Sequence, residues 1–186
     1  MNKSIILKHW SDLETDLDGN LLLKWFTDAE VMKYVGFSQK CKDIKTPEEA
    51  KNFSKLLKDG MFFGIYTPDG KLIGQTTFSR FSNQKCTFGI IIGEKDYWGQ
   101  GIGTEVTKLM VNHAFKNLNI KKIILETAGQ NIAGQKAYQK AGFKIVNEEQ
   151  DGRVILVDGE WLPDSTVKME IISNPIINSN NSTQSR

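Results

Sequence analysis

A chain of 186 residues with two cysteines and a formal net charge of +2 suits one folded domain whose core needs no disulfides. The small net charge argues against a nucleic-acid partner, because such domains concentrate basic residues on one face. Cys41 and Cys86 stand in no CxxC motif, so we expect reduced thiols and no metal site. The first ten residues contain too short an apolar run for a secretory signal, and no stretch approaches the roughly twenty apolar residues of a membrane span. We therefore expect a cytoplasmic protein.

The first sixty residues predict one strand and several helices. Residues 4–9 form a short apolar strand, and residues 20–35 carry apolar side chains at the spacing of two short helices. The next helix has the clearest signals: Thr46 is its N-cap, Glu49 completes a capping box, and Gly60 closes it.

The hydrophobic period then changes to two. Residues 61–67, 71–81 and 85–93 predict three consecutive strands joined by short turns, which is typical of an antiparallel meander.

The second half alternates strands and helices and then ends in strands. The expected elements are a helix over 104–118, a strand over 120–128, a helix over 131–142, and strands over 143–150, 153–159 and 165–172, with a turn at 158–160. The helix over 104–118 is expected to pack through Val106, Leu109, Met110, His113 or Ala114, and Leu118.

This element order predicts an α/β fold of the α+β type with a mixed, mostly antiparallel sheet. The strands 86–93 and 120–127 are its parallel pair, because a helix connects them. We place one domain at 1–172. Residues 173–186 are rich in Asn and Ser and show no periodicity, so we expect a disordered tail.

The segment YWGQGIGTEV, residues 97–106, places three glycines between a predicted strand and a predicted helix. A helix N-terminus offers unpaired N–H groups and the positive end of a dipole, and glycines let the backbone touch an anion, so the segment favours a phosphate site. The dinucleotide motif GxGxxG fails because Thr104 stands at its third glycine, and the GK[ST] of a P-loop is missing. An ordinary tight turn is the alternative interpretation.

A second group of residues follows the next strand. Asn131 opens a predicted helix, and Tyr138 lies two turns later on the same face, with Gly134 leaving that face open between them. Asn131 could be only a helix cap and Tyr138 only a packing residue. The alanines at four-residue steps form a stripe that can lie against the sheet; they are Ala133, Ala137 and Ala141.

Together these segments resemble the GNAT superfamily of acetyl-CoA-dependent acyltransferases, over most of residues 4–172. WGQGIGTE is similar to the family's pyrophosphate loop, Q/R-x-x-G-x-G/A. The family pattern N-x(6)-Y-x-K-x-G-F is matched by Asn131, Tyr138, Lys140, Gly142 and Phe143. Among branches, the chain looks most like the RimJ/RimL-type and the diamine or spermidine acetyltransferases, which share the YWG before the loop and the late aromatic segment around Trp161. Trp98 replaces the superfamily's general Gln or Arg, as is usual in this branch.

The resemblance implies a GNAT-like sheet whose parallel strands splay apart, with helices on both faces and acetyl-CoA (coenzyme A) bound in the gap. It implies that backbone N–H groups near Ile91 and Ile92 polarise the thioester carbonyl. Asn131 would bind the cofactor or the forming amide, and Tyr138 would bind the cofactor and protonate the departing thiolate as general acid. The cofactor-binding loop would comprise Trp98, Gly99, Gln100, Gly101, Ile102, Gly103 and Thr104.

The general base is the weak point of the resemblance. Many relatives carry a Glu early in the fourth strand, where this chain has Thr87. Glu126 is the catalytic candidate, while Glu105 more simply complements a helix dipole. His113 lies on the mid-body of its helix and His9 in the first strand, so both are weaker candidates.

The resemblance therefore predicts an acetyl-CoA-dependent N-acetyltransferase acting on a primary amine. A protein or peptide N-terminus is slightly favoured over a polyamine, an aminoglycoside or an amino sugar, because a peptide α-amine has a pKa of about 7.7–8 and a lysine-like amine about 10.4. The loop 36–46 carries lysines that would repel a polycation, whereas the acidic segment 148–151 would attract one. A non-catalytic acyl-CoA sensor is the alternative function. A homodimer is expected only by analogy with the branch, and neither nucleic acid nor a membrane is an expected partner.

Overall fold

The structure is a computed structural model that describes residues 5–9, 18–36, 38–41, 43–56, 60–157 and 159–174. The predicted tail lies outside these residues except for its first two positions. Ser173 donates a backbone hydrogen bond to Lys121 O.

The helices and strands, in chain order, are β1 (Ile6–His9), α1 (Gly19–Thr27), α2 (Ala29–Met32), the 3-10 turn η2 (Ser38–Cys41), α3 (Pro47–Leu56), β2 (Met61–Tyr66), β3 (Leu72–Ser82), β4 (Lys85–Ile92), the 3-10 turn η3 (Lys95–Tyr97), α4 (Ile102–Asn117), β5 (Lys122–Ala128), α5 (Ile132–Lys140), β6 (Lys144–Glu149), β7 (Val154–Val157), β8 (Glu160–Pro163) and β9 (Thr166–Ile172).

Two of the N-terminal helices, α2 and α3, begin at side-chain caps, of which the sequence predicted the one at α3. Asp28 accepts hydrogen bonds from the backbone N–H groups of Glu30 and Val31 at the start of α2. The predicted capping box of α3 is confirmed, since Thr46 Oγ1 accepts from the Glu49 N–H and Glu49 Oε2 accepts from the Thr46 N–H. Closure of this helix before Gly60 falls on residues outside the described part of the chain.

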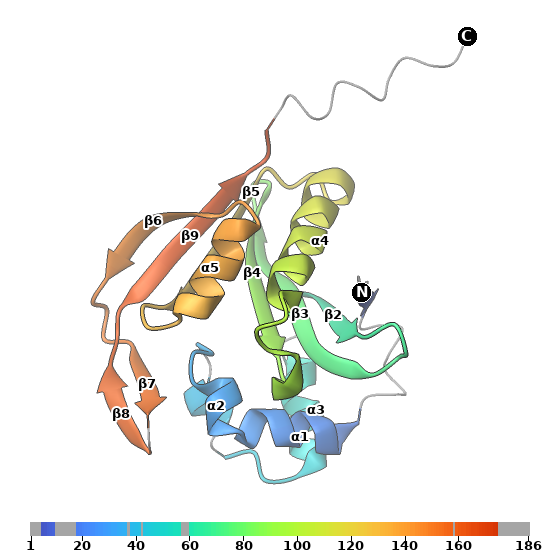
Figure 1. Cartoon of the computed structure of the whole chain (residues 1–186), viewed down its shortest axis with the longest axis vertical. Helices are drawn as coiled ribbons and strands as arrows, with labels where there is room; N and C mark the ends of the chain where they lie inside the picture. The colour runs from blue at the N-terminus through green and yellow to red at the C-terminus, as the bar shows by residue number, and fades with distance from the viewer. Residues whose placement is uncertain are drawn as a thin grey trace.

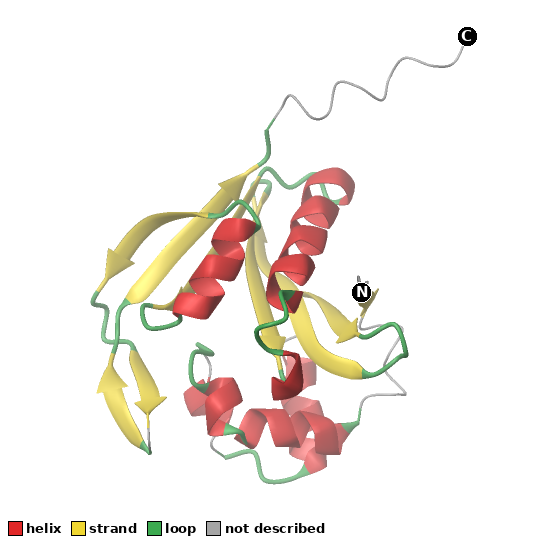
Figure 2. Cartoon of the chain, viewed as in Figure 1, coloured by secondary structure: helices red, strands yellow, loops and turns green. Residues whose placement is uncertain are grey.

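A seven-stranded sheet in the order β1-β2-β3-β4-β5-β9-β6 forms the centre of the molecule (Figure 2). The predicted meander is confirmed, because β2, β3 and β4 pair antiparallel in sequence. The predicted parallel pair of β4 and β5 is also present. Its register covers only residues 85–87 against 122–124. Beyond Thr87 and Ile124 the two strands no longer pair, so the sheet opens at their carboxyl ends.

Helices cover both faces of this sheet, as predicted. Figure 1 shows α4 and α5 side by side on one face and α1, α2 and α3 gathered at the lower end of the sheet. One core cluster joins α4 to the sheet through residues such as Met110 and Phe88, and a second joins the N-terminal helices to Ile91 of β4. Because Phe88 and Ile91 differ by an odd number of positions, they point to opposite faces.

Three details differ from the sequence analysis. Helix α4 begins at Ile102, two residues earlier than predicted, because the glycine segment itself enters the helix. Leu109 and Met110 were both predicted to pack, but only Met110 is buried, and Leu109 is 39% exposed. The segment after the turn at Gly159 was not predicted as a strand, yet β8 pairs with β7 in a separate two-stranded hairpin. Figure 1 shows this hairpin projecting past the sheet on the side of α2.

Candidate active site

A cavity of about 740 Å³ lies where β4 and β5 separate. Its volume falls within the range of roughly 300–1,000 Å³ that is typical of small-molecule sites. The walls come from α2 and the loop after it, from β2 to β5, from the glycine segment and from α5. Residues of the wall that bear on function are Glu30, Tyr34, Phe62, Gln75, Thr77, Gly89, Ile91, Ile92, Trp98, Gly99, Gly101, Ile102, Gly103, Thr104, Glu126, Asn131, Ala137 and Tyr138.

The glycine segment forms one end of the cavity, and its backbone explains two of its glycines. Gly99 and Gly101 have φ angles of +71° and +82°, a conformation that costs a residue with a side chain about 1–2 kcal/mol. A Cβ at either position would meet nothing within 4 Å, so the glycines are needed for the turn and not for protein packing. Their open sides leave the backbone accessible.

The N-terminus of α4 points its free N–H groups out of this turn. The first intrahelical bond runs from the Glu105 N–H to Gly101 O, so the N–H groups of residues 102–104 precede the helix ladder. Gly101 is the N-cap and supplies no side chain to satisfy them. A helix N-terminus of this kind suits a phosphate group.

Gln100 differs from its predicted neighbours in the loop. Its Nε2 donates to Asp96 O, and it does not belong to the cavity wall. The other predicted loop residues, from Trp98 to Thr104, all do. The side chain of Gln100 therefore stabilises the turn and is directed away from the cavity.

The backbone of β4 presents alternate residues to the gap. The Gly93 N–H donates to Ile73 O on the β3 side, whereas Gln84 O accepts from the Lys122 N–H on the β5 side. Because backbone groups alternate in direction along a strand, Ile91 directs its N–H at β3, and Ile92 directs its N–H at the gap. Of the two predicted positions, only Ile92 thus offers a backbone donor inside the cavity.

Trp98 fixes the same end of β4 from the loop. Its Nε1 donates to Ile92 O at 2.8 Å, and its side chain remains 39% exposed at the cavity edge. The indole therefore holds the glycine segment against the end of the strand.

Asn131 is used as a helix cap. Its Oδ1 accepts from the Gly134 N–H at 3.0 Å, and its Nδ2 donates to Thr127 Oγ1 at 2.9 Å. Gly134 is required by this contact, because a Cβ there would lie 2.5 Å from Asn131 Nδ2. Asn131 still belongs to the cavity wall, but both ends of its amide are engaged with the protein.

The alanine stripe of α5 does not lie against the sheet as predicted. Ala133 is exposed, and Ala133 and Ala137 belong to the cavity wall. A Cβ added at Gly103 would lie 3.9 Å from the Cβ of Ala137, so the small residues let α5 approach the start of α4.

Tyr138 lies in the cavity wall on the face covered by α4 and α5. Its ring makes edge contacts with Phe88 and Phe143, at centroid distances of 6.2 and 6.3 Å. Burial raises the pKa of the Tyr138 hydroxyl to about 12, so the phenol keeps its proton at every physiological pH.

Glu126 belongs to the opposite side of the cavity. It faces Lys168 across β5 and β9, and Lys168 also forms an ion pair with Glu149. A hydrogen bond to Glu149 raises the pKa of Lys168, with a smaller contribution from the charge of Glu126. Glu126 is exposed, so its carboxylate is accessible to water.

The other candidate bases lie away from the cavity. Glu105 accepts a hydrogen bond from the Ile5 N–H at 3.1 Å. His9 and His113 both contact Phe63 edge-on, with centroid distances of 5.3 and 5.6 Å. None of the three belongs to the cavity wall. This agrees with the sequence analysis, in which all three are weaker candidates for the general base than Glu126.

Several wall residues were missed from the sequence. Tyr34 and its neighbours follow α2, Phe62 comes from β2, and Gln75 and Thr77 come from β3. The available signal was the run QTT between Ile73 and Phe78, which are both buried, since a polar residue at an inward position of a strand needs an explanation.

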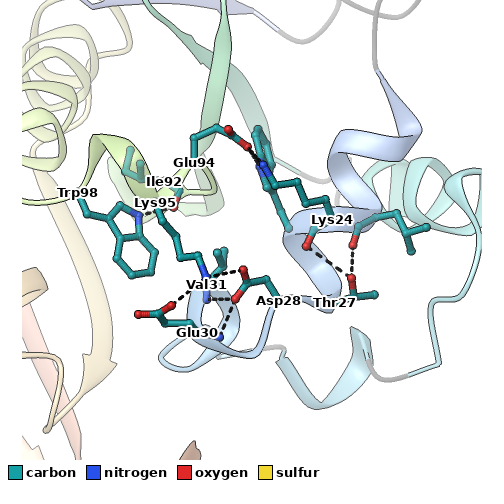
Figure 3. A network of polar contacts seen from close by, with 11 residues as sticks. Lys24, Thr27, Asp28, Glu30, Val31, Ile92, Glu94, Lys95 and Trp98 are labelled. Carbon is teal, nitrogen blue, oxygen red and sulfur yellow. Dashed lines mark hydrogen bonds and ion pairs between the residues drawn. The ribbon is translucent and has the colours of Figure 1, made fainter.

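An ionic network ties the N-terminal helices to the end of β4 (Figure 3). Glu94 is buried and accepts from Lys24 Nζ at 2.7 Å and from Trp25 Nε1 at 2.9 Å, and Lys71 lies 3.4 Å away. Burial alone would raise the pKa of Glu94, but the hydrogen bonds from Lys24 and Trp25 outweigh it and lower the pKa. Gly93 allows this packing, because a Cβ there would lie 2.2 Å from the Trp25 ring.

Lys95 makes a second connection in the same network. It contacts Asp28 and Glu30 of the α2 region at 2.9 Å each, as Figure 3 shows. Hydrogen bonds to Glu30 and Asp28 raise the pKa of Lys95. These ionic contacts therefore join the wall of the cavity next to α2 to the turn η3, which leads into the glycine segment.

Within the described ranges, no group of three His, Cys, Asp or Glu side chains could hold a metal ion, and no helix there is long and apolar enough to cross a membrane. Cys41 and Cys86 are both buried free thiols.

Comparison with known proteins gives the class of protein that this fold and cavity define. The acetyltransferase (GNAT) domain model matches residues 5–144. The chain belongs to the GNAT acetyltransferase family.

Individual relatives agree with this assignment. The chain is 23% identical over 157 residues to the uncharacterized N-acetyltransferase p20 of Bacillus licheniformis, covering 74% of this chain and 83% of that protein. It is 30% identical over 112 residues to the probable N-acetyltransferase YjcK of Bacillus subtilis (strain 168), covering 58% and 60% of the two chains. A spermidine N-acetyltransferase from Vibrio cholerae, in complex with CoA and spermine, has a TM-score of 0.70 at 18% identity, covering 91% and 95% of the two chains.

These findings confirm the predicted fold and enzyme class. The chain is an N-acetyltransferase that uses acetyl-CoA, so the alternative of a non-catalytic sensor is set aside. The cavity fits this cofactor in kind, because a positive-φ glycine turn and a helix N-terminus lie at one end and a backbone donor of Ile92 lies inside the gap.

Proposed function

We propose that this enzyme transfers the acetyl group to a neutral primary amine by direct attack on the thioester, and that a protein or peptide N-terminus is the favoured acceptor. The observation that carries the proposal is the cavity itself. It joins the glycine turn at one end to a pocket under α2 at the other, so donor and acceptor can meet where β4 and β5 separate.

The glycine turn and the first turn of α4 would hold the pyrophosphate of acetyl-CoA. Their N–H groups at residues 102–104 precede the helix ladder, and the open sides of Gly99 and Gly101 let an anion approach. Asn131 would contribute mainly by fixing the start of α5, since its amide is already hydrogen-bonded at both ends.

Acetyl-CoA supplies an activated acetyl group as a thioester. Ile92 would donate its N–H to the carbonyl oxygen as negative charge develops there. Tyr138 would donate a hydrogen bond to the sulfur. Its pKa of about 12 exceeds the roughly 8.5 of an ordinary thiol, so the phenol holds its proton more tightly than a thiolate would. In place of the proton transfer that the resemblance implies, Tyr138 would stabilise the thiolate through this hydrogen bond, and the sulfur would be neutralised by the proton that the attacking amine loses.

The acceptor pocket favours an amine that arrives uncharged. Thr87, Gly89 and Ile91 share the sheet face under α2, and none of them can accept a proton at neutral pH. Glu126 is the carboxylate in the wall that could take the amine proton, directly or through water. An α-amine is about a tenth neutral at pH 7, whereas a lysine-like amine costs roughly 3.5 kcal/mol more to deprotonate.

The charged segments considered in the sequence do not decide the acceptor. Lys40 and Lys45 are exposed but do not belong to the cavity wall. Glu148 accepts a hydrogen bond from Ser165, and Asp151 accepts one from Thr166, so the acidic segment is engaged within the protein. A polyamine remains the second candidate, because the Vibrio cholerae neighbour was solved with spermine.

Thiol release from acetyl-CoA tests the proposal. The purified full chain is assayed with N-terminal peptides, spermidine and related polyamines, aminoglycosides and amino sugars, with thermal shift in parallel. We expect turnover with peptide α-amines at pH 7 that exceeds turnover with polyamines. Turnover confined to polyamines would reject the favoured acceptor. Cofactor-dependent stabilisation without turnover of any amine would reject the whole proposal. The cytoplasmic location, the single domain over 1–172, the disordered tail and the homodimer remain predictions of the sequence.

A further inference from the structure

Gln75 presents a buried polar group that the fold leaves unsatisfied. It lies in the middle of β3 and is only 5% exposed, and it belongs to the cavity wall. Its amide oxygen, Oε1, has no hydrogen-bond partner among the described residues. A buried carbonyl oxygen without a donor is unfavourable and rare in native structures, so its presence next to a cavity calls for a ligand.

The surroundings of Gln75 leave space beside the amide. On β4 its cross-strand partner is Ile91, and on β2 its partner is Gly64, which has no side chain. Gly89 lies on the same sheet face opposite Thr77 and also lacks one. This face carries Ile91 and is covered by the N-terminal helices, so it is the acceptor side of the gap and not the side of Tyr138.

Other buried polar atoms without a hydrogen-bond partner provide a comparison. Within the described ranges, two other buried side chains have an unpartnered polar atom, Ser54 at Oγ and Arg153 at Nε. Neither belongs to the cavity wall. Gln75 alone among the three can therefore be satisfied by a molecule that enters the cavity.

We propose that Gln75 is the residue that positions the acceptor amine, with Oε1 accepting a hydrogen bond from one amine N–H. This inference rests on the proposed function. A side-chain amide carries no charge and takes no proton at neutral pH, so it holds the neutral amine and leaves the nitrogen lone pair free. That lone pair forms the bond to the acetyl carbon, and the C–S bond breaks with its electron pair going to sulfur. The single proton that the amine loses passes through Glu126 or water to that sulfur.

The change Gln75→Met tests this role, because methionine has a similar length and lacks the amide oxygen. We expect KM for the acceptor to rise on the order of tenfold, as for the loss of one hydrogen bond in a desolvated site, while KM for acetyl-CoA stays unchanged. The melting temperature should not fall, since the oxygen has no partner to lose. Ser54→Ala is the matched control: it removes the same kind of buried atom outside the cavity and should leave both KM values unchanged.

A second variant separates positioning from packing. Gln75→Glu keeps an accepting oxygen and adds a negative charge that favours the ammonium form of the bound amine, so the acidic limb of the pH profile of kcat should move to higher pH. Unchanged acceptor kinetics in Gln75→Met, or a melting temperature that falls together with the affinity for both substrates, would overturn the inference. An absence of amine turnover in the wild-type enzyme would instead reject the proposed function.

Discussion

The two ends of the cavity are built in different ways. The end proposed for the cofactor is made mostly of backbone: a glycine turn, the first turn of α4 and the unpaired edge of β4. The end proposed for the acceptor is made of side chains from segments far apart in the chain, such as Tyr34, Gln75 and Glu126. If the proposed roles hold, the enzyme fixes its donor by backbone conformation and selects its acceptor by side-chain chemistry.

The largest expected effect tests whether the chemistry belongs to the cofactor end. Tyr138→Phe should lower kcat on the order of 10²-fold, because the sulfur loses its hydrogen-bond donor as it gains charge. The affinity for acetyl-CoA should stay nearly unchanged, which is measured by thermal shift or calorimetry. Equal kcat in the two proteins would remove Tyr138 from the mechanism.

A backbone change should act on the donor alone. Gly101→Ala forces a side chain onto a residue with φ +82°, so we expect KM for acetyl-CoA to rise about tenfold and stability to fall by about 1–2 kcal/mol. Gly70→Ala is the matched control, because Gly70 has φ +87° in a turn, has equally open surroundings and does not belong to the cavity wall. It should lose similar stability without any change in KM. If both variants bind acetyl-CoA equally well, the glycine turn is not the phosphate site.

Glu126→Gln should act on the acceptor. We expect kcat/KM for a peptide amine to fall about fivefold at pH 7, a modest effect because the exposed position lets water replace the carboxylate as proton acceptor. The loss should shrink as pH rises and more of the amine is already neutral. A pH-rate profile measures both effects. A loss that is constant across pH would indicate a binding role.

The smallest effect concerns the network that joins the two ends. Glu94→Gln should destabilise the protein by about 1 kcal/mol at pH 7, because Gln still accepts from Trp25 and the exposed lysines return to water. The folded-state pKa of Glu94 is lowered, so its contribution is present above the unfolded pKa of about 4.3 and is lost as pH falls through the lower folded value. The difference in melting temperature from wild type should therefore shrink below about pH 4. Glu160→Gln, at an exposed position of β8, should show no such difference at any pH.

The sequence predicted the end of the cavity proposed for the cofactor better than the end proposed for the acceptor. Glycine spacing, capping residues and the change of hydrophobic period are local signals, so the meander, the parallel pair and the position of the loop were predicted correctly. The direction of each backbone N–H in β4 depends on register with β3 and β5, which no local pattern shows. The use of Asn131 as a cap and the turning of Gln100 toward Asp96 are likewise set by tertiary contacts.

The acceptor end was largely missed for the same reason. Gln75 was not predicted, although Glu126 was predicted as a catalytic candidate. The two residues lie 51 positions apart in the chain and line the same cavity only because the sheet places β3 and β5 on either side of β4. The strand β8 was missed because the hairpin it forms with β7 lies outside the main sheet, where no core imposes a clear alternation.

The pairing between β4 and β5 stops after three residues of each strand, and this affects the stability of the fold as well as its chemistry. A sheet ordinarily has two edges, and this one contains a further pair of edges inside it, beyond Thr87 and Ile124. Edges attract extended chains, and an extended ligand that carries amide groups can fill such a gap as an added strand would. Saturation with acetyl-CoA at 100 times its Kd adds about 2.7 kcal/mol to the free energy of unfolding. The lifetime of this enzyme in the cell should therefore follow the supply of its own donor substrate.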